Sequence, residues 1–114
     1  MTTIDAGAPV VTLINVFTVA PDRQEELVDL LVRATDEVMC EQPGFVSANI
    51  HRGLDGTHVA NYAQWRSRAD FEAMLAEPRC REHMAAAAAV ASFAPALYEV
   101  ASVHELSRSA PRSR

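Results

Sequence analysis

The chain of 114 residues contains no lysine, and all ten of its basic residues are arginines. Without lysine there is no Schiff-base residue, which excludes pyridoxal-phosphate chemistry, and no phosphate-binding lysine of the Walker type. Acidic residues outnumber basic ones by 15 to 10, and three of the ten arginines lie after residue 106. Removing these three positive charges from the net charge of −5 leaves −8 for residues 1–106. This charge disfavours binding to nucleic-acid phosphates.

Metal-binding and redox motifs are also missing. The two cysteines are 40 positions apart, so there is no Cys-x-x-Cys pair, and we expect free, buried thiols. The four histidines are His51, His58, His83 and His104, and no two have the i, i+4 spacing that places two ligands on one helix face. His51 and His58 flank a turn and could meet across a hairpin, but two exposed imidazoles at strand ends are the more common arrangement. We therefore expect no metal site.

Long apolar runs are absent as well. No stretch approaches the roughly 18 apolar residues of a membrane-spanning helix, and the first residues lack the basic and apolar regions of a signal peptide. These features predict a cytoplasmic protein that does not bind membranes. Residues 1–9 and 107–114 are mostly small or polar, so we expect a flexible N-terminus, one folded domain over residues 10–106 and a disordered basic tail.

The residues that are present predict an alternation of strands and helices. β-Branched runs, turn residues and helical spacing indicate a strand at 10–19, a helix from Pro21 to about Val38, a hairpin of strands at 45–52 and 57–65, two helices beginning after Ser67 and at Pro78, and a last strand at 96–105. Ser67 and Asp70 resemble a capping box. This order predicts an α+β protein with a ferredoxin-like split βαβ fold, in which helices cover one face of an antiparallel sheet.

Both faces of the predicted sheet are apolar. The first strand places Leu13 and Phe17 on one side and Ile14 and Val16 on the other. So short a chain can cover only one face with helices, and an exposed apolar sheet face is typical of a subunit interface. We therefore expect a homodimer joined through the sheet, with Tyr62 and Gln64 as interface residues.

A few polar residues are out of place in these strands. Asn15 and Asn61 each lie mid-strand on an apolar side, although asparagine is depleted in strands and a buried amide needs hydrogen-bond partners. Each could simply satisfy a bulge or a neighbouring side chain. Alternatively, Asn61 and Trp65, four residues apart with the small Ala63 between them, could line a flat aromatic pocket. Trp65 could equally be core filler.

His83 lies on the last predicted helix with Met84 and Ala87 as neighbours, so it could face a cleft and act as an acid or base. A surface histidine is the more common outcome for such a position. The shape of any pocket would depend on the packing of large side chains near these residues. These are Phe17, Phe71, Met74, Met84 and Phe93.

Several short segments together resemble the antibiotic biosynthesis monooxygenase family over roughly residues 10–105. They are Leu13-Ile14-Asn15-Val16-Phe17, Pro21-Asp22-Arg23, Pro43-Gly44-Phe45 and Asp55-Gly56-Thr57 followed by Asn61-Tyr62-Ala63-Gln64-Trp65. The resemblance is to the small quinone-forming members that act in aromatic polyketide pathways. It implies a dimeric α+β barrel and oxidation of an anthrone-like polyphenol to a quinone by O2, without flavin, haem or metal.

The resemblance also implies a site. In it, Asn15, Asn61 and Trp65 would line the substrate cleft and be the catalytic residues. Apart from the resemblance, the expected packing around the pocket leads us to predict that Phe17, Phe71, Met74, His83 and Met84 contact the substrate. The chain departs from the family pattern where Ile50 and Phe71 replace tyrosines and where Met84 lies near the position of an arginine. A non-catalytic dimer that binds an aromatic metabolite, a polyketide cyclase and a haem-degrading relative remain alternatives. The last would require His83 to replace a histidine expected about ten residues after the tryptophan.

Overall fold

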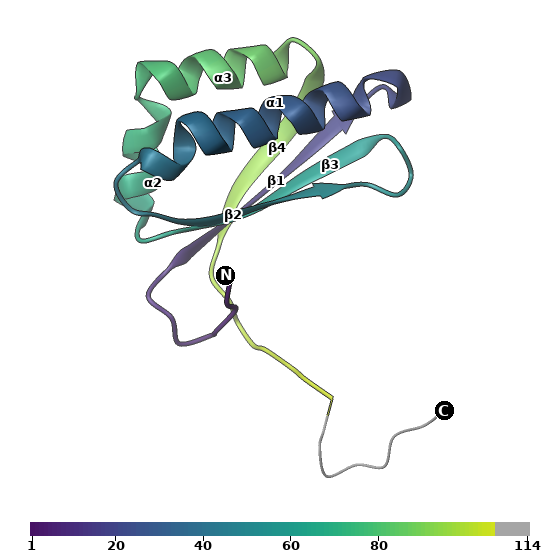
Figure 1. The fold of residues 1–114 in the computed structure, drawn as a ribbon. Coiled ribbons are helices and arrows are strands. Elements are labelled where there is room, and N and C mark those ends of the chain that lie inside the picture. Colours follow the sequence, from purple (N-terminus) through teal and green to yellow (C-terminus); the bar gives the residue numbers. More distant parts are fainter. Residues whose placement is uncertain (107–114) are drawn as a thin grey trace.

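The computed structural model describes residues 1–106, and the predicted tail at 107–114 lies outside the described residues. The elements follow the predicted order. They are β1 (Val11–Val19), η1 (Pro21–Arg23), α1 (Gln24–Glu37), η2 (Met39–Glu41), β2 (Phe45–Arg52), β3 (His58–Trp65), α2 (Arg68–Leu75), α3 (Pro78–Ala88) and β4 (Ala91–Tyr98). Figure 1 shows the three α-helices together on one side of the sheet. The predicted α+β, ferredoxin-like class is confirmed.

The four strands form one antiparallel sheet in the order β2-β3-β1-β4. β1 and β3 occupy the two inner positions, so the side chains in the middle of each are flanked by strands on both sides. This is the arrangement in which Asn15 and Asn61 become direct neighbours, because they are Cα partners in the β1–β3 ladder.

The last strand differs from the prediction. It was expected at 96–105, after Pro95, but β4 runs from Ala91 to Tyr98 and residues 99–106 form no regular element. Pro95 lies inside β4, opposite Asn15. The strand accommodates this proline because β4 is at the edge of the sheet, where backbone N–H groups that point away from β1 have no strand to bond and a proline there removes no ladder hydrogen bond. Proline was therefore the wrong boundary signal here.

The core beneath the helices divides into two apolar clusters. The first contains Leu13, Ala63 and Trp65 from the sheet, and the second contains Phe17 and Val59. Along β1 and β3 the two clusters are separated by one pair of residues, the two asparagines. The first cluster also includes Val38, Phe71, Met74 and Cys80 from the helical layer, and the second includes Leu27, Val28, Leu31 and Ala87.

Two local features fix the end of β3 and the start of α2. Ser67 caps the helix as predicted, because its hydroxyl accepts a hydrogen bond from the Asp70 N–H at 3.1 Å. Gly44 has a φ of +84°, and a Cβ atom there would lie 2.4 Å from the Asp70 side chain. Gly44 also accepts a hydrogen bond from the Arg66 N–H at 2.7 Å. A glycine is required at this contact, which holds β2 and α2 on either side of Trp65.

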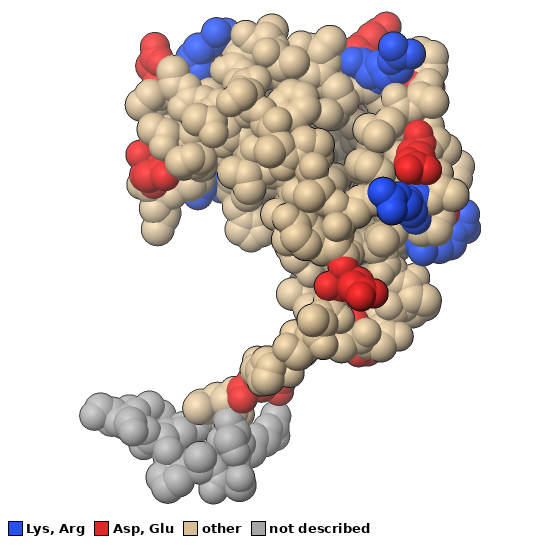
Figure 2. All heavy atoms as spheres, turned by 180° about the vertical axis from the view of Figure 1, so that it is seen from behind, with Lys and Arg blue, Asp and Glu red and all other residues tan. Residues whose placement is uncertain are grey.

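The face of the sheet opposite the helices is apolar in part, as predicted. Val16 and Tyr98 on this face are 42% and 49% exposed. Gln64, predicted to be an interface residue, is already covered within the chain, because its amide donates to the Thr3 carbonyl at 2.8 Å. Figure 2, which shows the molecule from behind, has charged side chains mainly around the rim of a broad uncharged area. Within residues 1–106, no helix is long and apolar enough to cross a membrane.

Candidate functional site

The floor of the site is a single row of residues across the sheet. Asn15 pairs with Asn61 on β3 and with Pro95 on β4, and Asn61 pairs with Ile50 on β2. The row is therefore Ile50, Asn61, Asn15 and Pro95. It places two amide side chains between the two apolar clusters, on the face that the helices cover.

A β-bulge brings more residues to this floor. The β2–β3 register shifts between Phe45 and Ser47, so that Phe45 faces Trp65 while Ala48 faces Ala63. Strict alternation would place Phe45 and Ala48 on opposite faces of the strand, but the extra residue returns both to the inner face. Sequence periodicity missed this pair for that reason. The small side chains of Ala48 and Ala63 leave space above the sheet.

Trp65 forms one wall of this space. Its ring meets Phe45 and Phe71 edge to face, with centroid separations of 5.5 and 6.1 Å. These contacts hold the indole in place, and only 2% of Trp65 is exposed. The prediction that Trp65 could be core filler is thus partly right, since the ring belongs to the first apolar cluster. Its N–H, however, is not used by the core.

Among the described residues, four buried side-chain polar atoms have no hydrogen-bond partner, and three of them line this one cavity. They are Asn15 Oδ1, Asn61 Oδ1 and Trp65 Nε1; the fourth is Thr12 Oγ1, on the other face of the sheet. Asn15 is only 4% exposed. Leaving a buried polar group unpaired costs about 1–3 kcal/mol. Three such atoms in one cavity make this cavity the candidate functional site.

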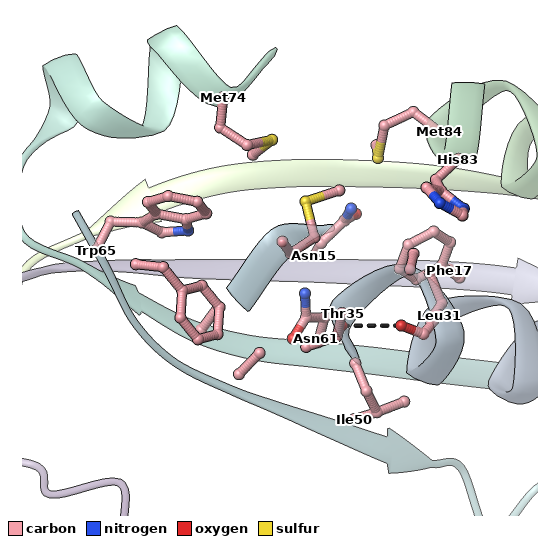
Figure 3. A pocket seen from close by; sticks show the side chains of 15 residues that line it. Asn15, Phe17, Leu31, Thr35, Ile50, Asn61, Trp65, Met74, His83 and Met84 are labelled. Carbon is pink, nitrogen blue, oxygen red and sulfur yellow. Dashed lines mark hydrogen bonds between the residues drawn. The ribbon is translucent and has the colours of Figure 1, made fainter. Parts of the chain in front are cut away.

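The inner cavity has a volume of about 60 Å³, and Figure 3 shows the side chains around it. A second cavity of about 360 Å³ adjoins it toward β4 and α2 and shares the side chains of Asn15, Met74 and Met84. The shared side chains therefore form the wall between the two spaces. Two of the three are methionines, whose flexible side chains adapt easily to a bound molecule.

The structure brings together most of the predicted site residues. The inner cavity is lined by Asn15, Phe17, Asn61, Trp65, Met74, His83 and Met84, as well as by residues that were not predicted. Phe71 lines the second cavity instead, because its ring packs against Trp65 from the outer side. Phe93 packs against Phe17 with a centroid distance of 5.2 Å and does not line either cavity.

The residues that sequence analysis missed come mainly from α1 and from the bulged strand. Thr35 lies one helical turn after Leu31, and its hydroxyl donates to the Leu31 carbonyl at 2.8 Å. This i, i+4 spacing was a usable signal for a shared face. The remaining members, Ala34, Met39, Phe45, Ala48, Ile50 and Ala63, complete the lining.

Charged groups lie outside the inner cavity. Arg68 and Glu72 line the second cavity and form an exposed ion pair at 3.4 Å. At the far end of the β2–β3 hairpin, hydrogen bonds from the Thr57 N–H and from His58 lower the pKa of Asp55 to about 2. Both His51 and His58 are exposed, as expected.

The cysteines are also peripheral to the site. Cys80 is a buried free thiol, as predicted, and burial raises its pKa. Cys40 is exposed, contrary to the prediction, because it lies in the short η2 turn on the surface. In the part of the chain that the structure describes, no three His, Cys, Asp or Glu side chains come together in a way that could hold a metal ion.

The fold of the chain agrees with the family comparison. Residues 10–86 match the model of the antibiotic biosynthesis monooxygenase family. The chain belongs to this family. The predicted resemblance is therefore confirmed.

Individual relatives support a monooxygenase. The chain is 53% identical to tetracenomycin-F1 monooxygenase of Streptomyces glaucescens over 83 residues, which cover 73% of this chain and 74% of that protein. Among solved structures, the monooxygenase from the gene ActVA-Orf6 of Streptomyces coelicolor, in complex with Nanaomycin D, has a TM-score of 0.79 and 29% identity, covering 90% of this chain and 99% of that one. SnoaB, a cofactor-independent oxygenase from Streptomyces nogalater, has a TM-score of 0.75 and 29% identity, covering 84% and 97%.

Proposed function

We propose that this protein is a cofactor-independent monooxygenase that uses O2 to oxidise an anthrone-like polyphenol of polyketide type to a quinone. The observation that carries the proposal is the set of three unpaired polar atoms in one apolar cavity. Two are amide oxygens, which accept hydrogen bonds, and one is an indole N–H, which donates. A polyphenol offers both the hydroxyl donors and the oxygen acceptors that such a site lacks.

The proposed reaction needs no redox group from the protein, because the substrate itself supplies the electrons. Loss of a proton gives an electron-rich anion, which passes an electron to O2; the two radicals then combine to form one C–O bond. Protonation of the peroxide and loss of water break the O–O bond and leave a carbonyl group. One oxygen atom ends in the quinone and the other in water, so no external reductant is consumed.

Asn15, Asn61 and Trp65 are the residues we assign to this reaction. The amide N–H groups of the two asparagines can donate to the oxygen on which the negative charge of the substrate resides, and fixed donors of this kind lower the energy of the anion. The Trp65 N–H lies at the cavity wall and can donate to a second oxygen, either on the ring system or on the peroxide. The two methionines and Phe17 would pack against the planar rings.

The two cavities together fit a polycyclic molecule better than either alone. The inner cavity, at about 60 Å³, is smaller than the roughly 300 Å³ or more of a typical ligand site, whereas the second cavity reaches about 360 Å³. A ring to be oxidised would enter the inner space, with the rest of the molecule in the outer space against Phe71. The similarity to tetracenomycin-F1 monooxygenase supports a polyketide-type substrate.

The test is oxygen uptake by protein pretreated with a chelator, with dithranol as the anthrone. We expect uptake well above the uncatalysed rate and formation of the quinone, and the double variant Asn61→Ala/Trp65→Phe should lose most of this activity. Asn49→Ala is the matched control, because Asn49 points to the other face of the sheet and bonds Thr2 and the Tyr62 carbonyl. Binding of dithranol with quenching of Trp65 fluorescence but no oxygen uptake would instead favour a binding protein.

We also propose a homodimer joined through the open face of the sheet. The support is the uncharged area in Figure 2 together with the exposure of Val16 and Tyr98. A face of this kind is costly to leave in water. Analytical ultracentrifugation at micromolar concentration should give the mass of two chains, and a monomer alone would contradict the proposal.

A further inference from the structure

We propose that His83 is the base that takes the proton from the phenolic substrate and later returns it to the peroxide; this assignment rests on the proposed function. His83 lines the inner cavity together with Asn15, Asn61 and Trp65. Figure 3 shows its imidazole projecting from α3 toward the sheet, near Met84 and Phe17. The more common outcome for such a histidine, a position on the outer surface, is not what the structure has.

The helix itself explains why His83 points inward. Cys80 and Ala87 are the two core residues of α3, with exposures of 0% and 1%, and they are seven positions apart. His83 and Met84 lie three and four positions after Cys80 and therefore share its face. Glu77 fixes the beginning of the helix, because its carboxylate accepts from the Arg79 and Cys80 N–H groups at 2.6 and 3.1 Å.

His83 is also the only ionisable side chain among the fifteen that line the inner cavity. The others are aliphatic or aromatic side chains, methionines, one threonine, two asparagines and the indole of Trp65, and none of these exchanges a proton near neutral pH. The substrate must nevertheless lose a proton before it can transfer an electron to O2. An imidazole is suited to accept it, since its ordinary pKa lies close to neutrality.

The imidazole has its hydrogen-bonding atoms free for this purpose. No hydrogen bond or ion pair among residues 1–106 involves the His83 side chain, whereas each of the other three histidines has a polar partner within the chain. Those partners are the Asn49 carbonyl for His51, Asp55 for His58 and Ser102 for His104. His83 is half-buried, so a bound ring system would cover it further.

No Asp, Glu or Arg side chain lines the inner cavity with His83, and the adjacent Arg81 and Glu82 on α3 are exposed. The side chains that α1 contributes to the cavity are neutral, α2 contributes Met74, and β4 carries no ionisable residue except the exposed Tyr98 on its other face. On α3 itself, Arg79 lies one turn earlier, but its guanidinium donates to the Glu37 carbonyl and lies 3.9 Å from Glu41. Arg68 and Glu72 line only the second cavity.

Over one turnover, His83 accepts one proton and returns it. Neutral His83 accepts one proton from the polyphenol and becomes an imidazolium, which stabilises the neighbouring anion. After the C–O bond has formed, the imidazolium returns the proton to the peroxide oxygen, and loss of water follows. His83 ends the cycle neutral, so each turnover consumes only the substrate and one O2.

The first experiment compares oxygen uptake by the wild type and His83→Gln across pH, with dithranol as substrate. General-base catalysis typically contributes a factor of about 100 or more, so we expect His83→Gln to lower kcat by that factor. The wild-type rate should fall toward acidic pH, because a protonated imidazole cannot accept the proton of the substrate, and this limb should be absent in the variant. His58→Gln, an exchange of an exposed histidine outside the cavity, should leave the rate and its pH profile unchanged. A His83→Gln enzyme with the wild-type rate and profile would overturn the assignment while leaving the proposed function intact.

The second experiment does not require turnover. Alizarin, a hydroxyanthraquinone whose colour changes when its hydroxyl group ionises, is titrated in the presence of each protein. If His83 accepts a phenolic proton, bound alizarin should ionise at a lower pH in the wild type than in His83→Gln. This result would support His83 even if dithranol were not oxidised, which would count against the proposed function alone. Identical titration curves for the two proteins would contradict the role of His83.

Discussion

The two halves of the core lie on either side of the Asn15–Asn61 pair and are built from similar apolar residues. They differ in whether their buried polar atoms have hydrogen-bond partners. In the half around Phe17, Leu27 and Val59, exposures are 1%, 0% and 0%, and no orphaned polar atom was found among the residues described there. The half around Trp65 contains the unpaired indole N–H, although side chains of both halves line the cavity. The first half satisfies its own polar atoms, whereas the second leaves polar atoms that the substrate would pair under the proposed function.

This difference indicates that one group of residues stabilises the fold and another carries out the proposed reaction, within one small sheet. Close packing gives the first half its contribution to the free energy of unfolding. The asparagine row and the Trp65 wall reduce that free energy, because their polar atoms are desolvated without partners. Changes in the first half away from the cavity, as at Leu27, should therefore lower stability without changing the chemistry, and changes at the asparagine row should do the reverse.

The largest expected effect on stability is that of Leu27→Ala. Leu27 is fully buried in the packed half, and truncation of such a leucine typically costs about 2–5 kcal/mol. Urea denaturation should show a loss in this range, whereas kcat of the folded protein should stay unchanged. Leu30→Ala, at a partly exposed position of the same helix, is the control and should cost much less. A loss of activity in folded Leu27→Ala would contradict the division between residues that stabilise the fold and residues that carry out the reaction.

A smaller effect of opposite sign is expected for Asn15→Leu, which replaces an unpaired buried amide by an apolar group of similar shape. Removing the desolvation cost should raise the free energy of unfolding by about 1 kcal/mol, while activity with dithranol is lost. Asn49→Leu is the matched control. Asn49 has partners at 2.6 and 3.1 Å, so its replacement should lower stability. If Asn15→Leu were as destabilising as Asn49→Leu, this would mean that the Asn15 amide has a hydrogen-bond partner in the ligand-free protein.

Much of this contrast could be predicted from the sequence. Alternation placed Asn15 on an apolar side of the first strand, and Asn61 and Trp65 on one side of another. The β1–β3 register in the structure then places the two amides side by side. The bulge that adds Phe45 could not be predicted, because its signal is a shift in pairing and not a residue type. The end of the sheet was also misjudged, since Pro95 is tolerated only because β4 is an edge strand, a fact of topology.

The position of His83 depended on tertiary structure as well. Helical spacing places it on the same face as Cys80 and Ala87, but the sequence does not say that this face is the buried one. The five alanines from 85 to 89 carry little apolar area, so the hydrophobic pattern of α3 is weak. Packing of α3 against α1 and the sheet decides the question.

The smallest expected effect concerns Asp55, at the end of the hairpin beyond the packed half. Gln24 on α1 ties this end down by donating to the Gly53 and His58 carbonyls at 2.9 and 3.0 Å. The pKa of Asp55 is lowered from 3.8 to about 2, chiefly by the Thr57 N–H and then by His58. A carboxyl whose pKa is depressed on folding stabilises the native state above its unfolded pKa, and this contribution is lost as the pH falls toward the folded value.

Asp55→Asn keeps an acceptor for the Thr57 N–H but removes the charge. The variant should therefore be slightly less stable than the wild type near neutral pH, and the difference should shrink as the pH falls from 3.8 toward about 2. Thermal denaturation at several pH values measures it. Because the hairpin end lies outside both cavities, the pH profile of activity should be the same in the two proteins. A shifted activity profile would mean that the packed end of the sheet is coupled to the site, and the two halves would then not be independent.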